Sequence, residues 1–302
     1  MLTLPALTTI DLSDNAFGGR SVEPMLEFLS SHETLEVLKL NNNGLGPAGG
    51  SEVARALRKN ALKAVEAGRQ PPLKVLVCGR NRLENGSALD WAAAFEASSQ
   101  LTELRMPQNG IRMEGIEAIA TALRSCASLQ VLDLQDNTAT EKGSRAIASS
   151  LASWPDLRQL NLSDCLLRPR GATSVMLELG KGANAKLESL KLQSNEMDAR
   201  SVDLLADAIL AHLSALTDLE LNGNRGTAED ECYEKVREAL SKWEHLEALD
   251  ELEDMEEEWD SEDEEEEEEE EEAEAQAEAP TKTAETAKED TDLSEQLGKL
   301  SV

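Results

Sequence analysis

The sequence has few of the residues on which metal binding and membrane insertion depend. Only 3% of its 302 residues are aromatic, so a core must consist mainly of Leu, Ile, Val and Ala. The four cysteines lie far apart without a CxxC pair, which favours free buried thiols over a zinc site or a disulfide framework. No stretch approaches the roughly 18 apolar residues of a membrane span. We expect a soluble intracellular protein that does not insert into a membrane.

Residues for catalysis are also scarce. The only histidines are His32, His212 and His245, and none belongs to a nucleophile motif. The stretch GRNRLENG (residues 79–86) contains two glycines but lacks the spacing of a phosphate-binding loop. We therefore expect no catalytic site of the protein's own, no metal and no cofactor.

Basic residues are few compared with acidic ones: the sequence has 29 Lys and Arg, 60 Asp and Glu, and a net charge of −31. Much of the excess lies between Asp250 and Pro280, which include nine consecutive glutamates, Glu264 to Glu272, and no Lys or Arg. Such a balance argues against nucleic acid as a direct ligand, because phosphate binding needs a basic face. Residues 250–302 are predicted to be a disordered, low-complexity acidic tail. Two roles stay open for it, a solubilising tail and an electrostatic arm for a basic partner.

The rest of the sequence is repetitive. Eight segments superpose without a gap on the pattern LxxLxLxxNxL, which is the signature of leucine-rich repeats. Their starts are spaced by 28 to 30 residues except for one interval of 38, for which we expect a loop insertion at Ala64–Pro72. The segments begin at Leu7, Leu35, Leu73, Leu101, Leu129, Leu157, Leu187 and Leu216.

Each position of the repeat has a predicted role, counted as an offset from its first leucine. The apolar residues at offsets 0, 3 and 5 point inward from a short strand and the turn before it. The residue at offset 8 must satisfy backbone groups where the chain leaves the strand, which an asparagine amide can do. That residue is Asn in seven repeats and Cys165 in the sixth.

Amphipathic helices are predicted between the strands, for example over residues 114–128, 142–154 and 201–213. The predicted fold is an α/β leucine-rich-repeat solenoid, a ribonuclease-inhibitor-like horseshoe with inner parallel strands and outer helices. We expect this domain to span residues 1–249, with a C-terminal cap at 231–249. No cap precedes Leu7, which suggests that N-terminal repeats are missing.

Several segments are similar to one family beyond the general repeat pattern. SDNAFG, NNGLGP, CGRNRLENGS, VLDLQDNT and LELNGNR, followed by an acidic run, resemble the Ran GTPase-activating proteins, especially those of fungi. The resemblance implies a GTPase activator that binds the GTP form of Ran and orients Ran's own catalytic glutamine, without an arginine finger. Aligning NNGLGP gives the orienting role to Asn42. The repeat pattern explains its neighbour Asn43 at offset 8 but leaves Asn42 unexplained.

The resemblance also implies partners and a place of action. Arg80, Arg82, Gln108 and Asp136 are candidate contacts with Ran, although each could equally be a solvated surface residue. A Ran-binding protein is a further possible partner, and the protein is expected to act as a monomer. The expected location is the cytoplasm, including the cytoplasmic face of the nuclear envelope, in support of nucleocytoplasmic transport.

One departure from the family affects the expected activity. The basic pair that the family carries ahead of the SDNAFG segment has no counterpart in this sequence. We therefore expect weaker stimulation of Ran than a longer relative gives. The alternative function is a non-catalytic acidic leucine-rich-repeat module, such as a chaperone for histones or other basic proteins. The 28- to 29-residue repeats favour the activator, because acidic nuclear proteins of that kind use shorter units.

Overall fold

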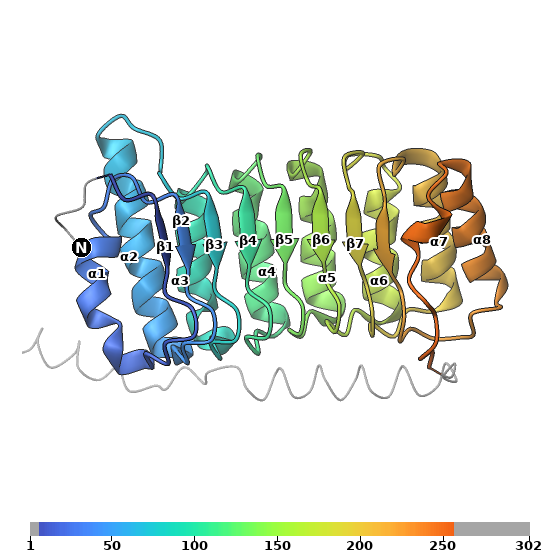
Figure 1. The fold of residues 1–302 in the computed structure, drawn as a ribbon, viewed down its shortest axis with the longest axis horizontal. Helices are drawn as coiled ribbons and strands as arrows, with labels where there is room; N and C mark the ends of the chain where they lie inside the picture. Colours follow the sequence, from blue (N-terminus) through green and yellow to red (C-terminus); the bar gives the residue numbers. More distant parts are fainter. Residues whose placement is uncertain (1–5, 257–302) are drawn as a thin grey trace, which may run out of the picture. The chain divides into compact units, whose positions relative to one another are not determined.

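The structure is a computed structural model that describes residues 6–256. Eight short strands alternate with helices in this part of the chain, and the strands form one sheet in chain order, β1 to β8 (Figure 1). Every neighbouring pair is parallel and in register, so Ile10 pairs with Leu38 and Leu38 with Leu76. The predicted α/β leucine-rich-repeat fold is confirmed.

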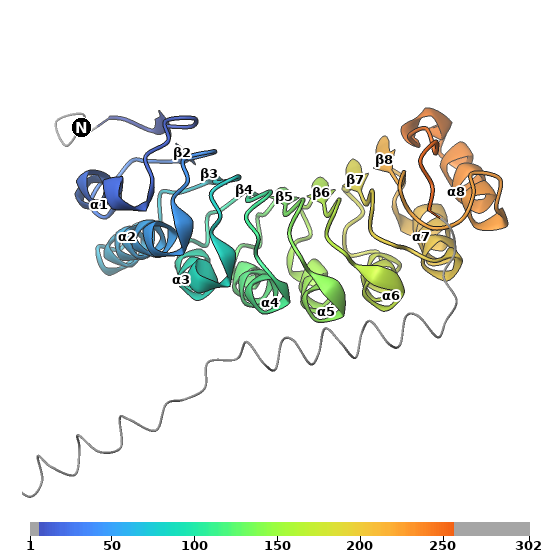
Figure 2. The same cartoon turned by 90° about the horizontal axis from the view of Figure 1, so that it is seen from below.

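The strands have three residues each: β1 Thr9–Asp11, β2 Val37–Lys39, β3 Val75–Val77, β4 Glu103–Arg105, β5 Val131–Asp133, β6 Gln159–Asn161, β7 Ser189–Lys191 and β8 Asp218–Glu220. The helices are α1 Glu23–Leu29, α2 Gly46–Glu66, α3 Glu84–Ala97, α4 Met113–Ala122, α5 Thr140–Ser150, α6 Arg168–Leu179, α7 Ala199–His212 and α8 Glu231–Lys242. Within this unit the strands line the inner side of the curve and the helices the outer side (Figure 2).

The core lies between the two layers. The residues at offsets 3 and 5 are buried, as Leu38, Leu40, Leu104 and Met106 illustrate with no measurable exposure. One repeat cannot enclose these side chains alone, so each layer is closed by its neighbours. Hydrophobic burial therefore links successive repeats and fixes the relative positions of the strand ends.

The offset-8 asparagines form a buried ladder. Asn81 Oδ1 accepts from the backbone N–H of Asn43 at 3.0 Å, and its Nδ2 donates to the carbonyl of Leu40 at 2.9 Å. Asn109 makes the same bonds to Asn81 N–H and to the Cys78 carbonyl. These amides satisfy backbone groups that would otherwise be buried without partners, as predicted.

Three local features differ from the sequence expectation. The long interval after the second repeat is taken up mainly by α2, so Ala64–Glu66 are helical and not part of a loop. Figure 1 shows the last turns of α2 extending beyond the neighbouring helices. The predicted helix 114–128 ends earlier, as α4 followed by a 3₁₀ turn at Leu123–Ser125, and α5 is likewise followed by Leu151–Ser153. Tightened final turns of this kind are common at helix ends.

The packed unit continues past the expected boundary at residue 249. After α8 and a 3₁₀ turn at Leu246–Ala248, the chain runs beside β8 as far as Glu256. Asp250 accepts hydrogen bonds from the backbone N–H groups of Leu221 (2.8 Å) and Asn222 (3.1 Å). This segment covers the edge of β8 that would otherwise expose unpaired backbone groups. The rest of the predicted disordered tail, residues 257–302, lies outside the described residues.

A bilayer-crossing helix requires both length and an apolar surface. None of the helices between residues 6 and 256 combines the two.

Candidate partner-binding rim

The residues that follow the strands at their C-terminal ends form a row of exposed or half-buried positions that we call the rim. It consists of the offset-7 residues Asp14, Asn42, Arg80, Gln108, Asp136, Asp164, Ser194 and Gly223. Each has a positive φ, between 50° and 73°. The chain therefore makes the same left-handed turn at the end of every strand.

This geometry corrects the view that the repeat leaves Asn42 unexplained. Among L residues, Asn and Asp tolerate the left-handed region best, and glycine does so without a Cβ penalty. Asn42 thus fits the backbone requirement of offset 7. Arg80 and Gln108 fit it less well, since a long side chain at such a φ costs about 1 kcal/mol.

The three consecutive asparagines have separate structural roles. Asn43 is buried in the ladder, with Nδ2 donating to the carbonyls of Leu12 and Leu40. Asn41 is half-buried, and its Oδ1 accepts from the backbone N–H of Gly79 at 2.6 Å. Asn41 therefore joins two repeats. Only Asn42 directs its side chain to the exposed surface.

Asn42 makes one side-chain hydrogen bond within the described residues. Its Nδ2 donates to Asp14 Oδ1 of the preceding repeat at 2.9 Å. Its backbone N–H donates to the Gly79 carbonyl at 2.9 Å, which fixes the turn on the other side. The side-chain amide of Asn42 is thus bonded to the first repeat and its backbone N–H to the third, while the side chain remains exposed.

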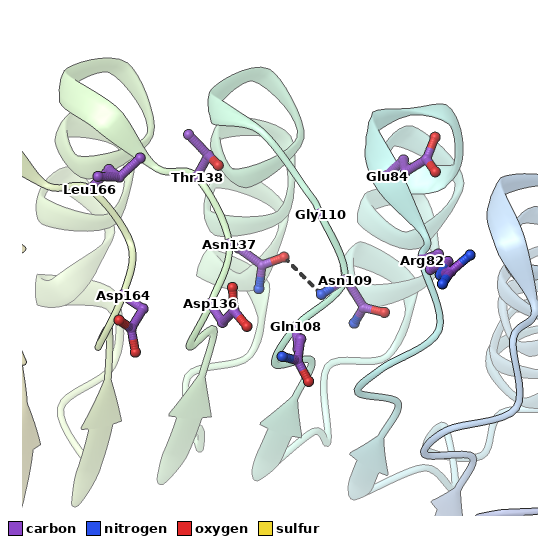
Figure 3. A pocket seen from close by; sticks show the side chains of 10 residues that line it. All are labelled: Arg82, Glu84, Gln108, Asn109, Gly110, Asp136, Asn137, Thr138, Asp164 and Leu166. Atoms are coloured by element: carbon purple, nitrogen blue, oxygen red, sulfur yellow. Dashed lines mark hydrogen bonds between the residues drawn. The ribbon is translucent and has the colours of Figure 1, made fainter. Parts of the chain in front are cut away.

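A shallow hollow of about 290 Å³ lies further along the same rim (Figure 3). Three of the predicted contact residues, Arg82, Gln108 and Asp136, line it together with Glu84 and Asp164. Three of these residues follow successive strands: Gln108, Asp136 and Asp164. Arg82 lies just before α3, and Glu84 is the first residue of α3. The hollow is open and of mixed charge, so it suits polar protein side chains better than a buried small molecule.

The other predicted residues lie beside the hollow and do not line it. Arg80 is exposed and its Nε donates to Gln108 Oε1 at 2.7 Å, so it orients a residue that does line the hollow. Asn42 belongs to the neighbouring repeat, on the same rim. The five predicted site residues therefore fall on four consecutive repeats, the second to the fifth, along one edge of the unit.

The structure gives no sign of a reactive group at this rim. Burial raises the pKa of the Cys78 and Cys165 thiols to about 12 and that of Cys126 to about 11. His32 is buried against Phe28, with 4.4 Å between ring centroids. Within residues 6–256, no group of three or more His, Cys, Asp or Glu side chains is arranged to hold a metal ion. What the rim offers is amides and charges in fixed positions.

Sequence reasoning did not select Asp14, Glu84 or Asp164 as contact residues, although the register of the repeats places Asp14 and Asp164 at offset 7 along the same rim. The glycines supplied one available signal. Gly223 occupies offset 7, and Gly44 and Gly110 occupy offset 9. All three have positive φ, and together they could have indicated a left-handed turn at the strand ends. The bond between Asp14 and Asn42 leaves no comparable signal in one sequence.

Comparison with known proteins supports the leucine-rich-repeat assignment. A family model described as Leucine Rich repeat matches residues 31–54. A segment of 120 residues is 38% identical to Ran GTPase-activating protein 1 of Saccharomyces cerevisiae, and one of 107 residues is 47% identical to Ran GTPase-activating protein 1 of Xenopus laevis. Ran GTPase-activating protein 2 of Caenorhabditis elegans is 49% identical over 111 residues. This chain is a leucine-rich-repeat protein with a segment similar to Ran GTPase-activating proteins.

The extent of these matches is limited. They cover 39%, 35% and 36% of this chain, and 29%, 18% and 12% of the yeast, frog and nematode proteins respectively. A solved leucine-rich-repeat protein of Leptospira interrogans aligns with 85% of this chain and 74% of its own, at 16% identity and a TM-score of 0.33. The fold assignment depends on the strand order and repeats described above.

Proposed function

We propose that this protein is a GTPase activator that binds the GTP form of Ran and stimulates Ran's own GTP hydrolysis. The observation that carries the proposal is the 38–49% identity to Ran GTPase-activating proteins of yeast, nematode and frog over more than 100 residues. In a cell this activity would discharge Ran in the cytoplasm and support nucleocytoplasmic transport.

The part of the rim from Asn42 to Asp136 is the proposed contact surface. Arg80, Arg82, Gln108 and Asp136 would contact Ran through hydrogen bonds and charge pairs at and beside the hollow. Recognition residues presented by a rigid scaffold are pre-organised, so less conformational entropy is lost on binding. The buried asparagine ladder supplies that rigidity directly beneath the rim.

Asn42 is the residue that we assign to the hydrolysis step. A neutral amide can hold another amide by hydrogen bonding, and this would keep Ran's catalytic glutamine in position to orient the attacking water. The proposed chemistry needs no proton transfer from the activator. It also needs no arginine finger, unlike the activation of GTPases by an inserted guanidinium.

The proposal is tested by single-turnover GTP hydrolysis on purified Ran with the full chain, with an unrelated small GTPase as control. Stimulation of Ran alone is the expected result. Binding to Ran or to histones without faster hydrolysis would instead support the non-catalytic acidic module. A chain ended at Glu256, the last described residue, separates the contribution of the following acidic segment from that of the repeats.

A further inference from the structure

The further inference concerns the direction in which the Asn42 amide faces. An asparagine side chain has a donor end and an acceptor end, and rotation about its last torsion exchanges them. In the structure the donor end is already engaged, because Nδ2 donates to Asp14 Oδ1 at 2.9 Å. Asn42 Oδ1 has no hydrogen bond within residues 6–256, and the residue is exposed. The amide therefore presents an acceptor to the outside.

The backbone on both sides keeps this pair together. Asp14 N–H donates to the Asn41 carbonyl at 2.9 Å, which places the two rim turns side by side. Asn42 N–H is bonded to Gly79 on the opposite side. If the amide rotated by half a turn, its oxygen would face the Asp14 carboxylate, and the bond to a charged acceptor would be lost. A hydrogen bond to a charged acceptor is stronger than one between neutral groups, so the orientation with Nδ2 toward Asp14 dominates.

We propose that Asp14 is a positioning residue, which fixes the Asn42 amide with Oδ1 outward so that Asn42 accepts a hydrogen bond from an amide N–H of the partner. The proposal rests on the function proposed above and adds the polarity of the contact. On Ran, the donor would be the side-chain NH₂ of the catalytic glutamine. Holding that NH₂ leaves the glutamine carbonyl oxygen to accept from the attacking water, which is the orientation that assists attack.

A second rim pair with the same 28-residue separation shows that the exposed end of the amide depends on the residue it pairs with. Arg80 Nε donates to Gln108 Oε1 at 2.7 Å. In that pair the amide oxygen is engaged and the NH₂ end of Gln108 is presented. The second and fourth repeats thus present opposite ends of an amide, and the charge of the paired residue decides which end.

The first experiment examines the hydrogen bond without any partner. The side-chain ¹⁵NH₂ signals of Asn42, assigned by comparison with Asn42→Gly, are followed by NMR in the full chain and in Asp14→Gly. Glycine is the suitable replacement because Asp14 has a φ of 60° and Gly223 occupies the same offset naturally. We expect one Asn42 amide proton to move upfield in Asp14→Gly. Unchanged Asn42 signals would overturn the proposal.

The second experiment separates positioning from folding by kcat and KM for Ran-GTP. Asp14→Gly is expected to lower kcat about tenfold and to leave KM within about twofold, since the acceptor is still present but no longer fixed. Asp14→Asn, which keeps an acceptor and tolerates the turn, should retain most of the activity. Asp156→Gly removes an exposed carboxylate that pairs with Lys186, away from the rim, and is expected to match the parent.

Exchanging the pair is the most specific variant. Asn42→Asp alone places two carboxylates together and is expected to be the least active single change. Asp14→Asn combined with Asn42→Asp restores a donor at 14 and an outward acceptor at 42, so activity should recover at least fivefold over Asn42→Asp.

If the exchange fails to recover activity, or if Asp14→Gly keeps the parental kcat while Asn42→Gly is impaired, the positioning role is wrong and the activator function stands. If the parent does not stimulate Ran, the proposed function fails, and the NMR result alone decides whether Asp14 orients the amide.

Discussion

Asn42 Nδ2 lies 2.9 Å from Asp14 Oδ1, and this bond joins side chains that are 28 residues apart in the sequence. The repeat makes the pair possible, because it returns the chain to the same left-handed turn one layer further along. Burial and the asparagine ladder build the scaffold, and the exposed amides and charges above it differ from repeat to repeat. Those differences are where recognition by a partner can reside.

Replacing Arg82 by glycine should separate stability from binding. Arg82 has a φ of 52° at an offset where the neighbouring repeats carry Gly44 and Gly110. Relief of the left-handed conformation outweighs the flexibility that glycine adds, so we expect about 0.5 kcal/mol of added stability. Affinity for Ran-GTP should fall about fivefold as a rim cation is lost. Thermal unfolding and calorimetric titration measure the two effects, and a less stable Arg82→Gly variant would argue against strain at this position.

Changes at Asn109 should show how much the buried ladder contributes. Its side chain makes bonds to Asn81 N–H and to the carbonyls of Cys78 and Met106. Asn109→Ala leaves Asn81 N–H and the Cys78 carbonyl without these partners, while the Met106 carbonyl keeps a bond from Asn137 Nδ2, and the change should cost about 3–5 kcal/mol. Asn109→Cys should cost less, since Cys165 occupies this offset naturally and donates to the Leu134 carbonyl. Urea unfolding measures the stability of the two variants. Equal losses of stability would mean that a thiol at this offset does not replace any of the ladder bonds.

Much of this scaffold could be predicted from the sequence and much of the rim could not. The spacing of Leu38, Leu40 and Asn43 predicts strand, core and ladder, because those roles are set by burial and recur in every repeat. The turn at offset 7 was missed because Arg80 and Gln108 occupy it despite their poor fit to a left-handed backbone. The sequence predicted a loop at Ala64–Pro72. No helix-ending residue separates Ala64–Glu66 from the preceding helical pattern, however, and α2 continues through these residues.

Contacts between repeats were the least predictable part. Nothing in the sequence indicates that Asn41 Oδ1 binds Gly79 N–H or that Asp14 binds Asn42, because both depend on side-chain direction in an assembled layer. The resemblance named Asn42 from its motif, and the structure supplied the geometry around it.

The inner face of the sheet should give a pH-dependent stability through Asp133. Burial raises the pKa of this carboxyl, against the lowering effects of Gln135 N–H and of Arg105, whose Nη1 lies 3.6 Å away. A raised native pKa means that the folded protein binds the proton more readily than the unfolded chain. The stability from this group therefore falls as pH rises through the raised pKa.

The matching variant is Asp133→Asn, which keeps an oxygen for Gln135 N–H. Its free energy of unfolding should exceed that of the parent at pH 7, and the difference should disappear below about pH 3, where Asp133 of the parent is protonated in both the folded and the unfolded state. Denaturant titrations at a series of pH values provide the measurement. An Asn variant that is less stable at pH 7 would show that the ion pair with Arg105 outweighs burial.

The cysteines should be inert in the native protein. All four are buried, and burial raises the pKa of Cys78 and Cys165 to about 12, so little thiolate is present at pH 8. Reaction with a chromogenic disulfide reagent should proceed only through unfolding and should become fast in denaturant. Rapid labelling of any of the four in the native protein would contradict the packing described.

The most direct test of the central claim compares Asn42→Gly with Ser194→Gly in single-turnover GTP hydrolysis on Ran. Both residues occupy offset 7 with φ near 50°, so glycine fits each turn and leaves the scaffold intact. The account predicts that Asn42→Gly slows the stimulated rate about 100-fold while Ser194→Gly matches the parent, as expected for loss of one pre-organised hydrogen-bonding group. An Asn42→Gly variant that stimulates Ran as fast as the parent would contradict the assignment of this rim amide to the hydrolysis step.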